Sequence, residues 1–495
     1  MKKVAIIGGG IAGMTAGILL QKAGFQTEIF EKNAVAGGQC TGWKREGYFI
    51  DNCIHWLTGT REGSALHELW KEIGALGDDV EVYEKEMFFS SKLNGEVLTF
   101  WRDKEKTRRE MLALSPEDEK EINKLIDYVE MAETMTVPVE KPFDAMNPLD
   151  FMKLGISMKS MGKVMKEYGK MDIKELAMGF KHPLIQRAII DYMPGGYQAY
   201  AFIVSYGTVT GGNGDIPKGG SMAMATRIAN KYKEKGGVLH TNSEVEKILF
   251  NAKKAEGILL KDGTKVEADY VVCACDTDYT FRALLPKEYM PKLLRKQYGE
   301  RKKYPVSSGF QIAYAVDGAF SEITGTRIFS CDEIEVGSQT VESMSIQAYD
   351  YEPDFAPEGK MILQSNFSQS EADYKYWEEI YQDKVAYYHK KNEIAQKAME
   401  RVVAEYPFLE GKIHILDVWT PITYTRYCNS YKGAYMSFVT TKQAKSITIP
   451  GKIKGLDNVL LASQWLMGPG GLPTAVAMGK FAAWHIIKKS HVMKM

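Results

Sequence analysis

The sequence predicts an α/β protein in which a discontinuous Rossmann-type domain is assembled from three segments. An α+β domain is expected from the two insertions between them. Three observations support this: a glycine-rich turn joins an apolar strand to a helix at the start of the chain, and further glycine-rich turns open helices near residues 219 and 470. Because these turns are far apart in 495 residues, distant segments must meet to complete one domain.

The first of these turns carries the strongest signal. Lys3–Ile7 is short, continuously apolar and ended by glycine, as expected of a buried parallel strand. It runs into Gly8-Gly-Gly10-Ile11-Ala12-Gly13, a G-x-G-x-x-G that a helical pattern follows. In such a turn the first glycine allows a tight bend, the second admits a pyrophosphate and the third lets helix and strand pack closely. The helix N-terminus then offers free N–H groups to the phosphates.

A carboxylate follows the second strand at the spacing expected for ribose recognition. Glu31 directly follows the strand Thr27–Phe30 and lies 18 residues beyond the last glycine of the turn, Gly13. This carboxylate can accept both ribose hydroxyls and would repel a 2′-phosphate, which disfavours NADP. No second G-x-G-x-x-G follows a strand, since Gly211–Gly214 has neither flanking element. We therefore expect no separate nicotinamide domain.

The residues after Glu31 decide between FAD and NAD. The run Glu31-Lys32-Asn-Ala-Val-Ala-Gly37-Gly38-Gln39-Cys-Thr41 is followed by Gly47-Tyr-Phe-Ile-Asp51-Asn-Cys-Ile-His55. This pattern resembles the N-terminal signature of FAD-dependent oxidoreductases of the amine oxidase superfamily, in the branch of phytoene desaturase, carotenoid isomerase and retinol saturase. The resemblance implies that His55 transfers a proton or orients a substrate. It also implies a set of residues at the flavin: Glu31, Lys32, Gly37, Gly38, Gln39 and Thr41.

Two later segments extend the resemblance. Asp215–Gly220 opens a helix that leads into strands, and in the family the backbone at the position of Val245 lies against the adenine. Asn458–Leu472 resembles the C-terminal motif of the family, with Ser463-Gln464 in place of the usual Gly-Asp. Gln464 can still hydrogen-bond a ribityl hydroxyl. The helix start at Gly471 and Leu472 can stabilise negative charge on the flavin, so we predict non-covalent FAD.

The domain boundaries follow from these segments. The FAD-binding domain is predicted at 1–71, 205–281 and 416–495, and the substrate domain at 72–204 and 282–415. Residues 72–204 should be mainly helical, and 282–415 should combine strands with a long helix at about 371–405.

Within the first insertion, residues 150–172 form a candidate membrane-facing helix. Lysines flank an apolar stripe, and such a helix could lie in a membrane interface, line a hydrocarbon tunnel or pack its stripe on the core. The stripe consists of Phe151, Leu154, Met158, Met161 and Met165.

The segment Thr420–Asn429 resembles a family segment close to the flavin, and Arg426 or Tyr427 could supply charge or a proton there. The resemblance implies an enzyme that acts on carbon–carbon double bonds of a long apolar substrate, by desaturation, saturation or cis–trans isomerisation. The alternatives are a flavin-dependent fatty-acid hydratase or double-bond isomerase, an amine oxidase, and a non-catalytic lipid-handling protein like the prenyl-binding GDP dissociation inhibitors.

The amino-acid composition excludes some classes of binding partner. Lysine plus arginine total 63 and aspartate plus glutamate total 63, which argues against a nucleic-acid-binding surface. The six cysteines form no CxxC pair and no His/Cys cluster with zinc spacing, so we expect no metal. Their pattern fits a reducing compartment, and no stretch approaches the roughly 20 apolar residues that cross a bilayer. We expect a cytoplasmic protein that could associate with membranes.

Overall fold

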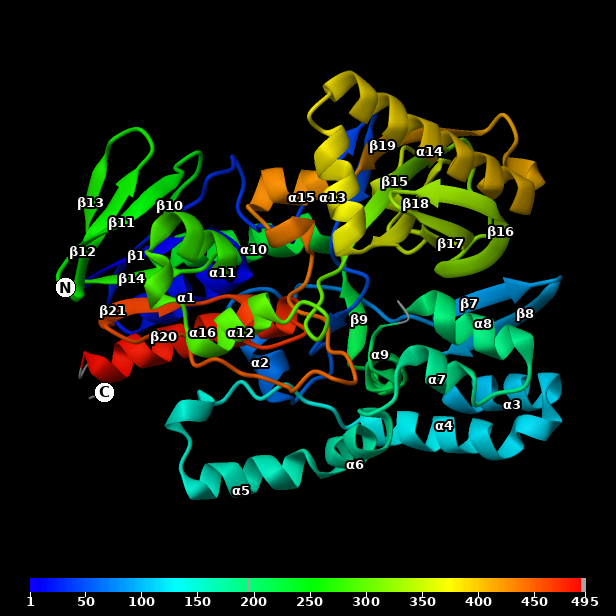
Figure 1. Ribbon diagram of the computed structural model, residues 1–495, viewed down its shortest axis with the longest axis horizontal. Helices are drawn as coiled ribbons and strands as arrows, with labels where there is room; N and C mark the ends of the chain where they lie inside the picture. The colour runs from blue at the N-terminus through cyan, green and yellow to red at the C-terminus, as the bar shows by residue number, and fades with distance from the viewer. Residues whose placement is uncertain (194–195, 491–495) are drawn as a thin grey trace.

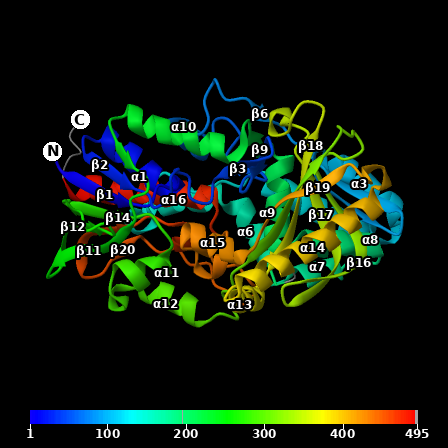
Figure 2. The same cartoon turned by 90° about the horizontal axis from the view of Figure 1, so that it is seen from above.

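The computed structural model of the protein describes residues 1–193 and 196–490. A six-stranded sheet lies near the chain termini and a seven-stranded sheet lies beside it along the long axis (Figures 1 and 2). The mixture of parallel strands and helices confirms the predicted α/β class. Residues 491–495, which the predicted C-terminal segment includes, lie outside the described part of the chain.

The six-stranded sheet takes strands from all three separated segments. Its order is β10 (Val238–His240), β2 (Gln26–Phe30), β1 (Lys3–Ile7), β14 (Tyr270–Cys273), β21 (Leu456–Leu461) and β20 (Lys452–Ile453). β1 pairs in parallel with β2 and β14, so that Val4 stands opposite both Thr27 and Tyr270. β14 pairs in parallel with β21. The boundaries of the domain remain predictions, but its sheet is assembled from distant parts of the chain.

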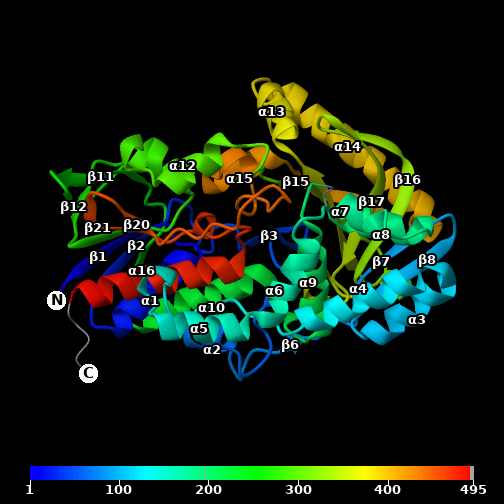
Figure 3. The same ribbon diagram turned by 60° about the horizontal axis from the view of Figure 1, so that its bottom comes forward.

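Three helices cover one side of this sheet: α1 (Ile11–Lys22), α10 (Gly220–Glu234) and α16 (Leu472–Lys489). On the other side lies a sheet of β11 (Val245–Asn251), β12 (Lys254–Leu260) and β13 (Lys265–Glu267) (Figures 1 and 3). α1 and α16 approach closely because glycine stands at their contact. A Cβ on Gly479 would lie 2.3 Å from the carbonyl oxygen of Ala12.

The seven-stranded sheet joins the two insertions. Its order is β19 (Ile413–Trp419), β15 (Ser308–Val316), β18 (Met361–Gln369), β17 (Gln339–Ala348), β16 (Thr326–Val336), β7 (Met87–Leu93) and β8 (Glu96–Trp101). β7 comes from the first insertion and pairs in parallel with β16 of the second. The helix expected at about 371–405 is two helices, α13 (Glu371–Ile380) and α14 (Lys384–Glu405). The chain turns between them because the Asp383 carboxylate caps the second.

The first insertion is mainly helical, but the single helix predicted at 150–172 is wrong. The helices are α3 (Lys104–Leu114), α4 (Glu119–Ala132), α5 (Pro148–Ser157), α6 (Lys159–Tyr168), α7 (Ile173–Ala177), α8 (Pro183–Tyr192) and α9 (Ala199–Thr210). Met158 ends α5 with non-helical torsion angles, and the two halves of the apolar stripe then differ. α6 buries Met161 in the core, whereas α5 buries no residue and lies at the edge of the molecule (Figure 1).

The remaining short elements lie around and between the two large sheets. They are the hairpin β3 (Gly42–Arg45) and β4 (Tyr48–Asp51), the small sheet β5 (Leu57–Thr58), β9 (Gly214–Pro217) and β6 (Val82–Tyr83), and the helices α2 (Ala65–Glu72), α11 (Thr277–Tyr279), α12 (Lys292–Gly299) and α15 (Pro421–Cys428). Across the described ranges, 1–193 and 196–490, no helix combines the length and apolar character needed to cross a membrane.

Candidate functional site

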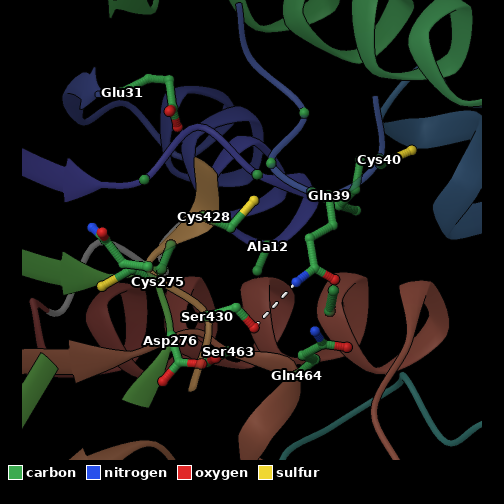
Figure 4. A pocket seen from close by; sticks show the side chains of 18 of the residues that line it. Ala12, Glu31, Gln39, Cys40, Cys275, Asp276, Cys428, Ser430, Ser463 and Gln464 are labelled. Carbon is green, nitrogen blue, oxygen red and sulfur yellow. Dashed lines mark hydrogen bonds between the residues drawn. The ribbon is translucent and has the colours of Figure 1, made fainter. Parts of the chain in front are cut away.

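A cavity opens at the carboxyl ends of the parallel strands (Figure 4). The residues directly after β1, β2, β14 and β21 line it, namely Gly8, Glu31, Ala274 and Ala462. It contains about 1110 Å³ of space that protein atoms do not fill, part of it open to solvent. Open α/β sheets bind ligands outside the carboxyl ends of their strands, so this cavity is the candidate site.

The turn after β1 forms a cradle of backbone atoms. Each of its three motif glycines lies in a different steric environment. Gly8 has φ +105°, and a Cβ there would lie 2.8 Å from the carbonyl oxygen of Ala274. A Cβ on Gly13 would lie 2.1 Å from the carbonyl oxygen of Gly8. Gly10 differs, because its φ is −74° and a Cβ would meet only the carbonyl oxygen of Gly37, 4.0 Å away. The protein leaves the space above Gly10 to the cavity.

The helix that follows the cradle begins without a cap. No side chain bonds to its first N–H groups, and its first turn carries no acidic residue. The first N–H groups of a helix have no intrahelical partner and carry the positive end of the helix dipole. The cradle and the uncapped helix start together fit a pyrophosphate.

Glu31 forms a second polar wall and is held in place by its neighbours. Its Oε2 accepts the N–H of Gly9 at 2.8 Å, and its Oε1 accepts the backbone N–H of Asn33 at 2.8 Å and the Asn33 Nδ2 at 2.9 Å. An ionised carboxylate offers about four acceptor positions. With three protein donors bound, Glu31 can accept a further donor such as a ribose hydroxyl.

Gln464 has a role at α16 that its sequence context does not indicate. Its Oε1 accepts the N–H of Gly471 at 2.7 Å, so the amide bonds to the N-cap residue of this helix. A Cβ on Gly470 would lie 2.9 Å from the same oxygen, so glycine permits the approach. Gln464 therefore lines the cavity with its own amide and also positions the start of α16, which lines the same cavity.

Most residues predicted to bind the cofactor meet at this cavity. Those that line it, together with the predicted catalytic Tyr427, are Gly8, Gly10, Ile11, Ala12, Glu31, Lys32, Gly37, Gly38, Gln39, Val245, Gln464, Gly471 and Leu472. Four predicted residues are not part of the lining: Gly13, Thr41, His55 and Arg426. Gly13 and Thr41 are buried, whereas the Arg426 side chain is exposed on α15. The functional roles of all these residues remain predictions.

His55 lies beside a buried lysine at the joint between the sheets. The Nζ of Lys85 donates to the carbonyl oxygen of His55 at 3.4 Å, and this ammonium has no ion-pair partner within the described residues. Burial lowers the pKa of Lys85 to about 8. The protein atoms packed around His55, and secondly the charge of Lys85, lower the pKa of His55, although the residue is partly exposed to solvent. The imidazole is therefore neutral at pH 7.

Sequence reasoning missed several polar residues of the lining, among them Asn33, Ser430 and Tyr435. Asn33 carried a usable signal, because its short amide stands two residues after Glu31 and can reach back to that carboxylate. Ser430 and Tyr435 carried none, since they belong to a loop after α15 that meets the cavity only through tertiary contacts. Within that contact, the Nε2 of Gln39 donates to the carbonyl oxygen of Ala434 at 2.9 Å.

Asp276 is a buried carboxyl in the cavity wall, and burial raises its pKa to about 7. Three N–H groups partly offset the burial, and they belong to Tyr431, Asp278 and Tyr279. A carboxyl whose pKa is higher in the folded state than in the unfolded chain stabilises the fold at low pH. That contribution is lost as the pH rises through about 7.

We therefore expect that Asp276 lowers the free energy of unfolding of the flavin-free protein by about 3 kcal/mol when the pH rises from 5 to 8. Asp276→Asn should remove this component, because an amide does not titrate and still caps a helix. Denaturant unfolding of both proteins at the two pH values measures the difference. Equal pH dependence in parent and variant would contradict the expectation.

Comparison with known proteins gives a consistent result. The family described as flavin containing amine oxidoreductase matches residues 11–487. A 4,4′-diaponeurosporene oxygenase of Staphylococcus haemolyticus is 23% identical over 97% of this chain and 96% of its own length. A lycopene-forming phytoene desaturase of a Paracoccus species is 25% identical over 57% of this chain and 56% of its own. The crystal structure of an oxidoreductase from Methanosarcina mazei has the same fold, with a TM-score of 0.61 and 18% identity over 97% of this chain and 99% of that one.

Proposed function

We propose that this chain, which belongs to the family of flavin containing amine oxidoreductases, is an FAD-dependent oxidoreductase. Its proposed substrate is a long apolar polyene, and its proposed reaction takes place at the carbon–carbon double bonds of that polyene. The observation that carries the proposal is one cavity that combines the anion cradle at Gly10 with the carboxylate of Glu31. The relatives named diaponeurosporene oxygenase and phytoene desaturase support the substrate class.

The residues of the cavity suggest how FAD would be held. The cradle at Gly10 and the start of α1 would bind the pyrophosphate, Glu31 the ribose, and Val245 the adenine. When bound, flavin supplies a carrier for two electrons. We propose that it is held without a covalent bond, because burial raises the pKa of the Cys428 thiol and keeps this cavity cysteine protonated and weakly nucleophilic. Acid precipitation should therefore release the flavin into the supernatant.

Two side chains are proposed to handle protons. His55 is neutral at pH 7 and can accept a proton, while the ammonium of Lys85 lies at its backbone. Burial raises the pKa of Tyr427, so its hydroxyl stays protonated and can donate. The exposed Arg426 remains a prediction from the sequence alone.

The decisive experiment incubates the flavin-loaded protein, in oxidised and in reduced form, with carotenoids, retinoids and unsaturated fatty acids. Mass spectrometry with chromatography distinguishes loss or gain of two hydrogens from isomerisation and from gain of water. We expect desaturation, saturation or isomerisation of a polyene. Hydration of a fatty acid would replace this proposal by the hydratase alternative, and absence of turnover in both redox states would remove it.

We propose further that α5 contacts a membrane from which the substrate enters. Its apolar side chains face solvent: Leu149, Phe151, Met152 and Ile156 are 52%, 50%, 57% and 69% exposed. Five lysines along α5, α6 and the turn after α6 are exposed and make no ion pair within the described chain: Lys153, Lys159, Lys163, Lys166 and Lys170. An exposed apolar face beside unpaired lysines is typical of a helix that binds anionic lipid surfaces.

The double change Phe151→Ser and Ile156→Ser is expected to weaken binding to vesicles about tenfold or more, because two apolar side chains no longer enter the lipid. Cosedimentation with phosphatidylcholine vesicles, with and without phosphatidylserine, measures the affinity. Val385→Ser is the matched control, since Val385 is 79% exposed on α14, on the opposite side of the molecule from α5 (Figure 1). Equal binding of all three proteins would show that α5 is not the contact.

A further inference from the structure

Two cysteines lie just beyond the end of the β3–β4 hairpin. The register of the hairpin ends with Gly42 opposite Asp51, and the N–H of Asn52 bonds to the carbonyl oxygen of Thr41 at 3.1 Å. The regular ladder stops there, because the N–H of Thr41 turns back to the carbonyl oxygen of Gln39 at 3.0 Å. Cys40 precedes Thr41 and Cys53 follows Asn52, so the two cysteines flank the last contact between the two segments. A disulfide requires Cα atoms about 4.4–6.8 Å apart, a separation that residues flanking such a contact can reach.

The surroundings of the Cys40 thiol agree with this proximity. The largest cause that raises the pKa of Cys40 is its side-chain hydrogen bond to Cys53, in which the Cys40 thiol is the donor, and burial is the second cause. Ser221, at the start of α10, holds both ends of the pair. Its carbonyl oxygen accepts the Cys40 Sγ at 3.4 Å, and its hydroxyl accepts the N–H of Ile54 at 2.9 Å. Ser221 thus holds both the Cys40 thiol and the backbone directly after Cys53.

The pair lies at the end of the cavity opposite the proposed ribose site. Both cysteines are among the lining residues, Cys40 fully buried and Cys53 partly accessible. Figure 4 shows Cys40 beside Gln39, across the cavity from Glu31. If Glu31 binds the ribose, the redox-active ring of the flavin belongs at the far end, near Cys53.

We propose that Cys40 and Cys53 are a dithiol–disulfide pair that exchanges two electrons with the flavin. The inference rests on the proposed function, because it requires flavin in this cavity. Two S–H bonds break and one S–S bond forms. The two electrons and one proton pass to oxidised flavin, and the second proton passes to solvent. The reverse exchange gives two thiols and oxidised flavin. All six cysteines are free thiols in this structure, which is the reduced state of the pair.

The test is an anaerobic reductive titration of the flavin-loaded protein after equilibration with air, which regenerates oxidised flavin. Parent protein should take up about four electrons per flavin, two for the flavin and two for the disulfide. Cys53→Ser should take up about two electrons per flavin. Cys40→Ala should do the same, and this second variant keeps the test valid if one of the two variants misfolds. Cys331→Ser is the matched control and should behave like the parent, since Cys331 lies in β16, outside the cavity lining.

A thiol count gives a readout that does not depend on turnover. Alkylation and peptide mass spectrometry should find Cys40 and Cys53 blocked by a disulfide in the air-equilibrated, flavin-loaded parent, and free in flavin-free protein treated identically. Two electrons per flavin with both thiols free would overturn the pair and leave the proposed function standing. Loss of the extra electrons in Cys428→Ser rather than in Cys53→Ser would also overturn it. A protein that cannot be loaded with flavin would overturn both proposals.

Discussion

Gly10→Ala is expected to fold like the parent protein and to lose flavin affinity at least a hundredfold, or about 2.7 kcal/mol. Gly10 has an extended backbone with φ −74°, which alanine adopts freely. An added Cβ would meet no protein atom closer than the 4.0 Å contact with the carbonyl oxygen of Gly37. The methyl group would instead project into the cavity, where a pyrophosphate must approach the backbone. Flavin content and fluorescence titration of the reconstituted protein measure the loss.

Gly13→Ala is the contrasting variant in the same turn. Its Cβ would lie 2.1 Å from the carbonyl oxygen of Gly8, so α1 would have to move away from the strand. We expect this variant to lower the stability of the protein as a whole, with flavin binding lost as a consequence. If Gly10→Ala lowered the melting temperature as much as Gly13→Ala, or kept full flavin affinity, the cradle interpretation would be wrong.

Arg102→Met is expected to lower the free energy of unfolding by about 3–5 kcal/mol, because it leaves a buried carboxylate without its partner. The Nη1 of Arg102 contacts Oδ1 of Asp215 at 2.5 Å, and the Asp215 side chain is only 6% exposed. Asp215 lies in β9, where it stands opposite Leu57 of β5. Losing the pair should therefore also disturb β5, which begins two residues after His55.

Denaturant unfolding at pH 7 measures this loss against two controls. Lys22→Met removes an exposed ion pair, in which the side chains of Lys22 and Glu72 are 66% and 30% exposed, and should cost less than about 1 kcal/mol. The double variant Arg102→Met with Asp215→Asn should recover part of the stability, because no unpaired carboxylate remains. A cost for Arg102→Met as small as that for Lys22→Met would mean that the pair is effectively solvated.

The part of the cavity lining around the Gly8–Gly13 turn was largely predictable because its determinants are local. The turn Gly8–Gly13, the carboxylate after β2 and the glycine pair at Gly37 each follow directly from a strand or a turn in the sequence. Gln464 was predicted at the cavity for the same reason. Its bond to Gly471 was not, because it depends on how the loop between β21 and α16 folds back.

The substrate half was predicted less well because its determinants are contacts between distant segments. Helical periodicity at 150–172 continued across Met158, where the backbone breaks, since periodicity reports side-chain spacing and not torsion angles. The pairing of β7 with β16 joins residues from different insertions, and no local pattern contains that information.

The sequence by itself determined the class of fold, the glycine turn after β1 and the acid beside it, because glycine conformations and strand ends are set by nearest neighbours. Only the tertiary structure decided which of these residues share one cavity, that Arg426 lies outside it, and that Cys40 and Cys53 both line it. The physical reason is that cavity membership depends on how separate segments pack on one another. That packing is the sum of many weak contacts, and no short stretch of sequence encodes it.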